Sequence, residues 1–360
     1  MRVLITGGAG FIGASLAKEL AGQGGVTVVA VDNLLPQVHG DGVLRRRFPE
    51  DAQMIVGDVR NGDLLDQVIS DLQPDFVVHF AAETGTSQSM SECSRHASVN
   101  VVGTAELVDA LKRSNVRPLS ILLASSRAVY GEGAWRSADG VSFYPGIRSR
   151  SQFLEMRWDF KSRDGRFAFP LAHFAPEVHP HPTSVYGATK LAQEHILEAW
   201  CAANDISLCI LRFQNVYGIG QSPSNPYTGI INIFHHIARK AETIPLYEDG
   251  LITRDFVWID DVVDCCIRAL NQKIPGINTY DVGSGKSVTI AEVASVVADF
   301  HKAPAPVVTG QFREGDVRFA TANISKTTAD LGYVPKTSLQ EGVFMVGEWL
   351  FSENPSSADL

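Results

Sequence analysis

Tyr186 and Lys190 stand four residues apart in a stretch with helical periodicity. This spacing places both side chains on one face of a helix, one turn apart. An ammonium beside a phenol favours the phenolate and lowers the pKa of the phenol toward neutrality. The pair is therefore predicted to be a general base that takes a hydroxyl proton while a hydride leaves the same carbon.

A serine completes this candidate site. Ser126 closes the segment Ala124-Ser125-Ser126, directly after a predicted strand at 119–124. Its hydroxyl is predicted to hydrogen-bond the reacting oxygen and hold it in line. Tyr-x-x-x-Lys by itself is equally compatible with an exposed helix face, and its combination with Ser126 and a glycine turn favours catalysis.

A glycine turn follows the first predicted strand. The run is Thr6-Gly7-Gly8-Ala9-Gly10-Phe11-Ile12-Gly13, and a helix is predicted to begin near Phe11. Glycines at 7, 10 and 13 permit a tight turn and a close approach to a diphosphate, which the helix N-terminus attracts. This context predicts a dinucleotide site rather than a simple turn.

Residues at the ends of the next strands are predicted to contact the same dinucleotide. Asp32 would accept hydrogen bonds from the adenosine ribose and repel a 2′-phosphate, so NAD is expected rather than NADP. The remaining candidates are Asn33, Asp58 and Val59 near the adenine end, and Phe80, Ala81 and Ala82, where the chain lies against the cofactor.

These side chains need a parallel sheet to position them. Short apolar runs alternate with helical stretches, a pattern typical of a doubly wound α/β sheet of the Rossmann type. The predicted strands are 3–6, 26–31, 53–56, 76–80, 119–124 and 207–213, and the predicted helices are 11–22, 61–71, 93–114 and 184–204.

The second half is less regular and is predicted to be a smaller, mixed α/β substrate-binding lobe. We expect an NAD-binding domain at 1–212 and this lobe at 213–360, with some segments returning to the first domain. Helices are predicted at 227–241, 260–271, 290–301 and 339–351.

One long insertion, 133–182, separates the strand before Ser126 from the helix of Tyr186. Its many aromatic residues argue against disorder. We predict that it is ordered and forms a wall or lid near the reacting carbon; the alternative is a distant surface or a subunit contact.

Composition narrows the choice of partners and compartment. The 360 residues carry a formal net charge of −9, which disfavours nucleic acid and anionic membranes as partners. Five cysteines without a Cys-x-x-Cys pair indicate free thiols, no metal site and a reducing compartment. No signal peptide or membrane-spanning run is visible, so a cytoplasmic protein is expected.

The motifs occur together in one order across nearly the whole chain. These are the glycine turn, Asp32-Asn33, HFAAE, SSRAVYG, SVYGATK, LRFQNVYG, RDF at 254–256 and REGDVR at 313–318. They resemble the extended short-chain dehydrogenase/reductase family, specifically its NAD-dependent nucleotide-sugar epimerases. The segment 220–229 and the insertion are most similar to dTDP-L-rhamnose 4-epimerases.

This resemblance implies a function and further site residues. The expected reaction is epimerisation at C4 of a nucleotide-activated hexose or 6-deoxyhexose, dTDP- or UDP-linked, through a 4-keto intermediate. Family members pair helices like 93–114 and 184–204 between subunits, so a homodimer is expected. By resemblance, Gln214 meets the cofactor, Thr84 the sugar ring, and Asn215, Arg254 and Arg318 the substrate diphosphate, with Arg313 and Asp316 nearby.

Three other functions are less compatible with these motifs. A 4,6-dehydratase of this family carries an Asp-Glu pair where this chain has Arg127 and Ala128. A 4-ketoreductase would use the same three catalytic residues but release its cofactor, usually NADPH, which Asp32 disfavours. A non-catalytic binding protein on the same scaffold is disfavoured by the complete Ser126, Tyr186 and Lys190 set.

Overall fold

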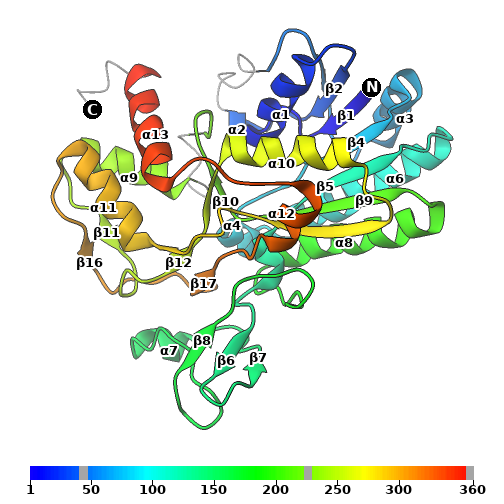
Figure 1. Cartoon of the computed structure of the whole chain (residues 1–360). Coiled ribbons are helices and arrows are strands. Elements are labelled where there is room, and N and C mark those ends of the chain that lie inside the picture. Colours follow the sequence, from blue (N-terminus) through cyan, green and yellow to red (C-terminus); the bar gives the residue numbers. More distant parts are fainter. Residues whose placement is uncertain (40–47, 223–228, 354–360) are drawn as a thin grey trace.

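The computed structural model describes residues 1–39, 48–222 and 229–353. Its centre is a parallel sheet of seven strands in the order β14-β9-β5-β4-β1-β2-β3 (Figure 1). The strands are β1 (Arg2–Thr6), β2 (Thr27–Asp32), β3 (Gln53–Val56), β4 (Phe76–His79), β5 (Ser120–Ser126), β9 (Ser207–Phe213) and β14 (Ile277–Val282). The predicted doubly wound sheet is confirmed, and its six predicted strands are present within two residues at each end.

Helices cover both faces of this sheet, which explains why its strands are apolar throughout. One face carries α1 (Phe11–Ala21) and α10 (Ile259–Gln272), and the other carries α3 (Gly62–Leu72), α6 (Gly103–Arg113) and α8 (Val185–Asn204) (Figure 1). Two separate clusters of buried side chains fill these layers.

The predicted helix 93–114 is interrupted. It consists of α5 (Cys93–Ala97), a π-helical segment at Ser98–Val102 and then α6. The wider turn places Asn100 in the interior, where its amide donates to the Thr189 hydroxyl (2.9 Å) and the Glu83 carbonyl (3.1 Å). π-Helical turns are frequent at functional sites, and this one lies against the helix of Tyr186.

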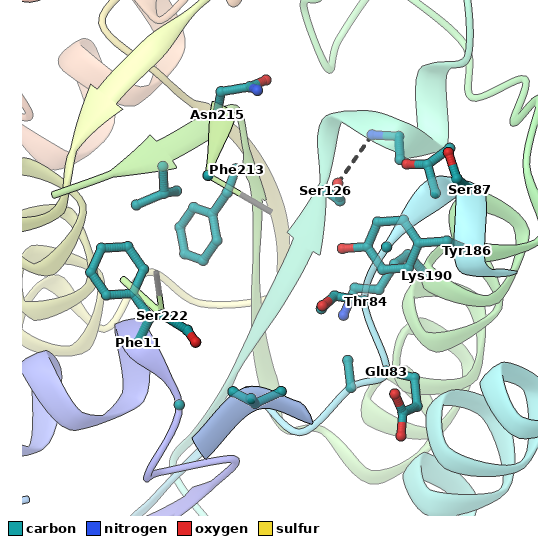
Figure 2. Close-up of a pocket in the computed structure, with 18 of the residues that line it drawn as sticks. Phe11, Glu83, Thr84, Ser87, Ser126, Tyr186, Lys190, Phe213, Asn215 and Ser222 are labelled. Atoms are coloured by element: carbon teal, nitrogen blue, oxygen red, sulfur yellow. Dashed lines mark hydrogen bonds between the residues drawn. The ribbon is translucent and has the colours of Figure 1, made fainter. Parts of the chain in front are cut away.

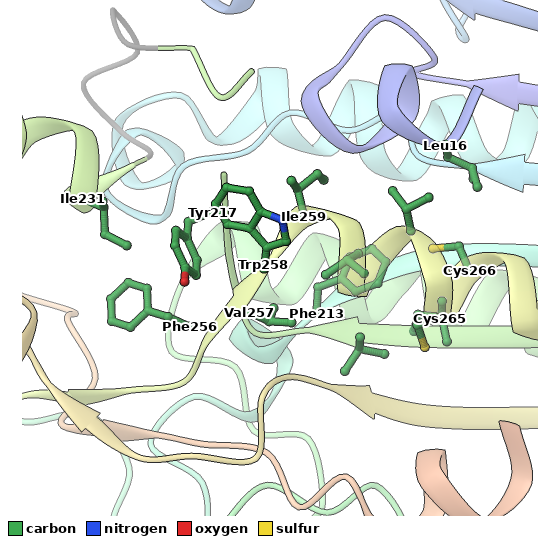
Figure 3. Close-up of a cluster of buried hydrophobic side chains, with 14 of the residues drawn as sticks. Leu16, Phe213, Tyr217, Ile231, Phe256, Val257, Trp258, Ile259, Cys265 and Cys266 are labelled. Carbon is green, nitrogen blue, oxygen red and sulfur yellow. The ribbon is translucent and has the colours of Figure 1, made fainter. Parts of the chain in front are cut away.

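The second half contributes to both lobes. Strand β14 lies at the edge of the large sheet, and α10 packs on α1. A continuous hydrophobic cluster joins Leu16 of α1, Cys265 and Cys266 of α10, and Tyr217, Phe256 and Trp258 of the second lobe (Figure 3). The two lobes therefore share one core, and the division at residue 212 remains a proposal.

The remaining elements form the outer part of the second lobe. Thr289 and Glu292 form a capping box that begins α11 at the predicted residue. The predicted start of the 227–241 helix, Tyr227, lies outside the described residues. The elements are β10 (Asn215–Tyr217) with β13 (Phe256–Trp258), β11 (Pro245–Leu246) with β16 (Val307–Val308), β12 (Thr253–Arg254) with β15 (Val288–Thr289) and β17 (Phe319–Ala320), α9 (Ile230–Arg239), α11 (Ile290–His301), α12 (Ser325–Leu331) and α13 (Leu339–Glu353).

The insertion is a small unit that projects from the body (Figure 1). It holds the sheet β7-β6-β8 and a short helix: β6 (Trp135–Ser137), β7 (Ser142–Phe143), β8 (Ala168–Pro170) and α7 (Arg150–Leu154). Trp135 and Phe160 pack edge to face in its own small core. The aromatic residues of the insertion thus supply apolar area for a folded unit, as expected.

All five cysteines are free thiols. Within the described residues, no three His, Cys, Asp or Glu side chains gather in a group that could hold a metal ion. No described helix has both the length and the apolar character needed to cross a membrane.

Candidate active site

A cavity of about 990 Å³ lies at the carboxyl ends of the central strands. The sheet order reverses between β1 and β4, and ligands of doubly wound sheets bind at such a switch point. Residues after β1, β2, β4, β5 and β9 line one part of the cavity, and residues of the second lobe line the rest.

Ser126 and Tyr186 lie together on one side of this cavity, opposite Phe11 and Phe213 (Figure 2). Ser126 is the last residue of β5, and its Oγ accepts a hydrogen bond from the Ala128 amide (3.1 Å). Tyr186 lies in the first turn of α8, which the Ser184 side chain caps. The strand end and the helix start therefore fix the two hydroxyl groups next to each other.

The protonation state of Tyr186 differs from the expectation. Burial raises the pKa of the phenol above its ordinary value, while a hydrogen bond with Ser126 and the charge of Arg127 lower it by less. The prediction that Lys190 lowers this pKa is wrong for the protein alone. Lys190 donates instead to Gln193 Oε1 (2.5 Å).

Lys190 is buried behind Tyr186 in a polar network. Burial lowers the pKa of Lys190 to about 7, and the charge of Glu194 partly opposes this shift. Gln193 then donates to the Thr104 hydroxyl (2.8 Å) and contacts His79 Nε2 (3.1 Å). The ammonium is thus held in place by groups on three different elements.

His79 at the base of this network gives a pH-dependent prediction. Burial, with a smaller contribution from Lys190, lowers the pKa of His79 to about 3. Between pH 6.5 and 3 the unfolded chain therefore binds a proton that the folded protein does not, so stability falls as the pH falls below 6.5. We expect His79→Gln to remove a slope of about 1.4 kcal/mol per pH unit in that range.

The measurement is the urea-unfolding free energy of the wild type and the variant at about pH 7.5, 5.5 and 4.5, so that two values lie in the range where the slope is expected. His195→Gln, which replaces an exposed histidine of α8, is the matched control. Equal slopes for the wild type and His79→Gln would contradict the prediction.

The glycine turn packs so closely against the neighbouring backbone that two of its positions admit only glycine. A Cβ on Gly7, whose φ is +70°, would lie 2.5 Å from the Ala81 amide nitrogen, and one on Gly13 would lie 2.4 Å from the Gly7 carbonyl oxygen. Among the described side chains, none caps the first turn of α1. The backbone N–H groups of Phe11 and Ile12 at the start of α1 therefore remain available to a diphosphate.

Asp32 closes the other side of the turn. Its carboxylate accepts hydrogen bonds from the Ala9 amide (3.0 Å) and the Leu34 amide (2.9 Å), and it lines the cavity. A carboxylate fixed at the end of β2 is the group that an NAD ribose requires. The residues present thus fit the cofactor.

Most of the predicted site residues come together at this cavity. Those that line it are Gly7, Gly10, Phe11, Ile12, Gly13, Asp32, Asn33, Val59, Phe80, Ala81, Ala82, Thr84, Ser126, Tyr186, Lys190, Gln214, Asn215 and Arg254.

Asp58 and Arg318 do not line it. Asp58 forms an ion pair with Arg60 (2.8 Å), whose hydrogen bond lowers the pKa of Asp58 to about 2. Arg318 is buried, and its guanidinium donates to three carboxylates, those of Asp159, Glu248 and Asp249. The arrangement therefore gives no support to a diphosphate contact by Arg318.

Two other arginines line the cavity in addition to Arg254. Arg313 lies over the Tyr247 ring, 5.1 Å from its centroid, and both side chains line the cavity. Arg127 follows Ser126 directly and donates from Nε to Asn215 Oδ1 (2.8 Å). From the sequence, Arg127 was used only as evidence against a dehydratase. Its position directly after Ser126 already indicated that it lies at the candidate active site.

The insertion 133–182 contributes no residue to the lining of the cavity. The prediction that it forms a wall there is wrong. It contacts instead the loop whose residues Arg313 and Asp316 line the cavity: Arg148 donates to the Asp316 carbonyl (2.7 Å), and Phe153 stacks on Phe312. The insertion therefore packs against a loop that lines the cavity, without lining the cavity itself.

Comparison with known proteins gives one family. The model of the NAD dependent epimerase/dehydratase family matches residues 3–146 and 166–283. The dTDP-L-rhamnose 4-epimerase of Burkholderia thailandensis is 48% identical over 352 residues, covering 98% of this chain and 95% of that protein. A putative UDP-glucose 4-epimerase of Methanocaldococcus jannaschii is 27% identical, covering 98% and 99%.

Solved structures agree with these matches. The UDP-glucose 4-epimerase of Thermotoga maritima, solved with UDP-glucose, has a TM-score of 0.78 at 25% identity and covers 98% of this chain and 99% of its own. The UDP-glucose 4-epimerase of Thermus thermophilus, solved with NAD, has a TM-score of 0.74 at 27% identity, with 97% and 98% covered.

Proposed function

Because the chain belongs to the NAD dependent epimerase/dehydratase family, we propose that it epimerises C4 of a nucleotide sugar with NAD as a retained cofactor. The observation that carries this proposal is the position of Ser126, Tyr186 and Lys190 beside an NAD-compatible glycine turn in one cavity. The 48% identical relative makes dTDP-L-rhamnose, or a closely similar dTDP-linked 6-deoxyhexose, the first substrate to test.

NAD, which the glycine turn and Asp32 would hold, would supply the hydride acceptor and donor that inversion at C4 requires. Burial keeps the Tyr186 phenol protonated in the protein alone, so its role as a base requires the positive charge of oxidised nicotinamide, which would favour the phenolate. In that form Tyr186 takes the proton of the C4 hydroxyl and later gives it back. Ser126 orients the reacting oxygen by a hydrogen bond, and Lys190 supplies positive charge behind the phenol. The cavity of about 990 Å³ leaves space for the 4-keto sugar to turn over between the two transfers.

Three cavity-lining side chains are proposed to hold the substrate diphosphate. They are Asn215, Arg254 and Arg313, with Arg313 replacing Arg318 in this role. Arg254 is buried and held by Asp316, whose Oδ1 accepts from its terminal nitrogen (2.7 Å). A planar guanidinium fixed in this way suits a phosphate.

The alternatives are less compatible with the site. Arg127 and Ala128 supply neither the acid nor the base that a 4,6-dehydratase requires. A reductase would consume one reduced cofactor in each turnover, whereas an epimerase returns its own hydride. Isotope transfer separates these reactions.

We expect the purified protein, with no NAD added, to convert dTDP-L-rhamnose deuterated at C4 into its C4 epimer with the deuterium still at C4. The label is retained because the hydride leaves and returns within one active site. The measurement is NMR of the product, together with quantification of NAD released on denaturation.

Two outcomes would contradict the proposed reaction. In a parallel reaction in D2O, incorporation of solvent deuterium at C3 or C5 would indicate epimerisation at those carbons by proton abstraction. Stoichiometric formation of NADPH and a 4-keto sugar when NADP is added would indicate a 4-ketoreductase acting in reverse, because the substrate carries a hydroxyl at C4. If dTDP-L-rhamnose is not converted, a panel of UDP-, GDP- and CDP-sugars tests the wider substrate class.

We further infer a cytoplasmic homodimer. Five unpaired cysteines suit a reducing compartment, and the family resemblance implies pairing through α6 and α8. Light scattering coupled to size-exclusion chromatography measures the oligomeric state, and a monomer would contradict the inference.

A further inference from the structure

Arg127 is partly buried, and its guanidinium differs from those of the buried arginines of this protein. Arg148, Arg212 and Arg254 each face a carboxylate at 2.7–2.9 Å. The guanidinium of Arg127 has one hydrogen bond, from Nε to Asn215 Oδ1. Among the described residues, none accepts a hydrogen bond from its two terminal nitrogens, although the side chain lines the cavity.

The charge of Arg127 is also uncompensated. Burial and the neighbouring Arg254 lower the pKa of Arg127 to about 9, and Asp316, Tyr186 and Glu132 offset these effects only in part. Two guanidinium groups in one partly enclosed cavity repel each other, and an anion between them would remove that repulsion. The electrostatics therefore favour a negatively charged ligand.

The position of Arg127 indicates which negatively charged part of the ligand it would bind. Arg127 follows Ser126, the residue proposed to orient the reacting oxygen, and Asn215 begins β10 at the neighbouring strand end. Ser126 and Asn215 both line the cavity (Figure 2). Because Asn215 Oδ1 accepts from Arg127 Nε, the amide nitrogen of Asn215 is left to donate to a ligand. The outer edge of the guanidinium presents two parallel N–H groups, which match two oxygens of a phosphate.

We infer that Arg127, together with Asn215, binds the sugar-proximal phosphate of the substrate and so sets the sugar ring against Ser126 and Tyr186. This inference rests on the proposed function, because it assumes a nucleoside diphosphate sugar. It assigns Arg127 as a binding residue beside the reaction centre, separate from the diphosphate contacts of Arg254 and Arg313.

The test compares dTDP with dTMP, which lacks the sugar-proximal phosphate. Their dissociation constants are measured by calorimetry for the wild type, Arg127→Gln and Arg127→Lys. We expect Arg127→Gln to weaken dTDP binding on the order of 10–100-fold, the range of a lost charged hydrogen bond, and dTMP binding by less than about twofold. Arg127→Lys should recover part of the loss, since it keeps the charge but not the paired N–H groups.

Arg136→Gln, at an exposed position of β6 outside the cavity, is the matched control. Equal dTDP affinity in the wild type and Arg127→Gln would overturn the inference. So would an equal loss for dTMP and dTDP, or a loss seen only with a nucleotide sugar that carries a C6 carboxylate. If the wild type binds neither nucleotide, the dTDP-linked substrate of the proposed function is wrong, and the same comparison is made with UDP and UMP.

Discussion

Tyr186→Phe is expected to lower kcat by about 10²–10⁴-fold, the usual contribution of a general acid–base group. The variant loses only the phenol oxygen that takes the C4 hydroxyl proton. The ring stays packed at the start of α8, so the fold and the bound NAD should be retained. The measurement is kcat with the identified nucleotide sugar, together with the NAD content of the purified variant.

Two further variants make this result specific. Tyr144→Phe removes an exposed hydroxyl of the insertion, which accepts from the His179 amide, and should leave kcat unchanged. Ser126→Ala should lose less activity than Tyr186→Phe, because it removes an orienting hydrogen bond rather than the base. Retention of most activity by a folded, NAD-loaded Tyr186→Phe would remove Tyr186 from the mechanism.

Arg148→Ala is expected to cost roughly 3–5 kcal/mol of unfolding free energy, because it leaves the buried carboxylate of Glu132 without a cation and that of Glu248 with Arg318 alone. Arg148 is 3% exposed and lies 2.9 Å from Glu248 and 3.2 Å from Glu132, both buried. Burial already raises the pKa of Glu132 to about 7, and Arg148 opposes that shift. The measurement is the urea-unfolding midpoint and slope at neutral pH.

The same variant should also weaken substrate binding. Arg148 donates to the carbonyl of Asp316, and the carboxylate of Asp316 holds Arg254 in the cavity. Loss of the first bond loosens the second, so KM should rise more than kcat falls.

Arg150→Ala is the matched control, two residues along the insertion. Its ion pair with Glu314 joins side chains that are 72% and 55% exposed, and such surface pairs contribute little to stability. Equal unfolding midpoints for Arg148→Ala and Arg150→Ala would show that the buried pairs do not stabilise the junction between the insertion and the lobe.

The sequence by itself determined the sheet and the reaction centre. Both follow from patterns within short stretches of sequence. The alternation of apolar runs with helical stretches predicts the sheet, and the four-residue spacing predicts that Tyr186 and Lys190 lie on one helix face. Parallel strands also place their carboxyl ends at one edge of the sheet, so Gly7, Asp32 and Ser126 necessarily lie at the same edge. These are the predictions for which position along the chain was enough to fix position in space.

Only the tertiary structure decided which arginines face the cavity. Arg313 and Arg318 are close neighbours in the sequence, yet the first lines the cavity and the second is buried among carboxylates from two other segments. Those partners lie 69 to 159 residues away in the sequence, so no local pattern could reveal them.

The anchoring of the insertion and the pKa of the Tyr186 phenol could not be predicted from the sequence either. The aromatic content of 133–182 predicted a folded unit, but its anchoring to the second lobe depends on Arg148 meeting Glu248, 100 residues away. The Tyr186–Lys190 spacing predicted the pair, but the pKa of the phenol depends on how much water the assembled cavity excludes. Burial and distant charge partners exist only once the chain is folded, and they set the electrostatics of this site.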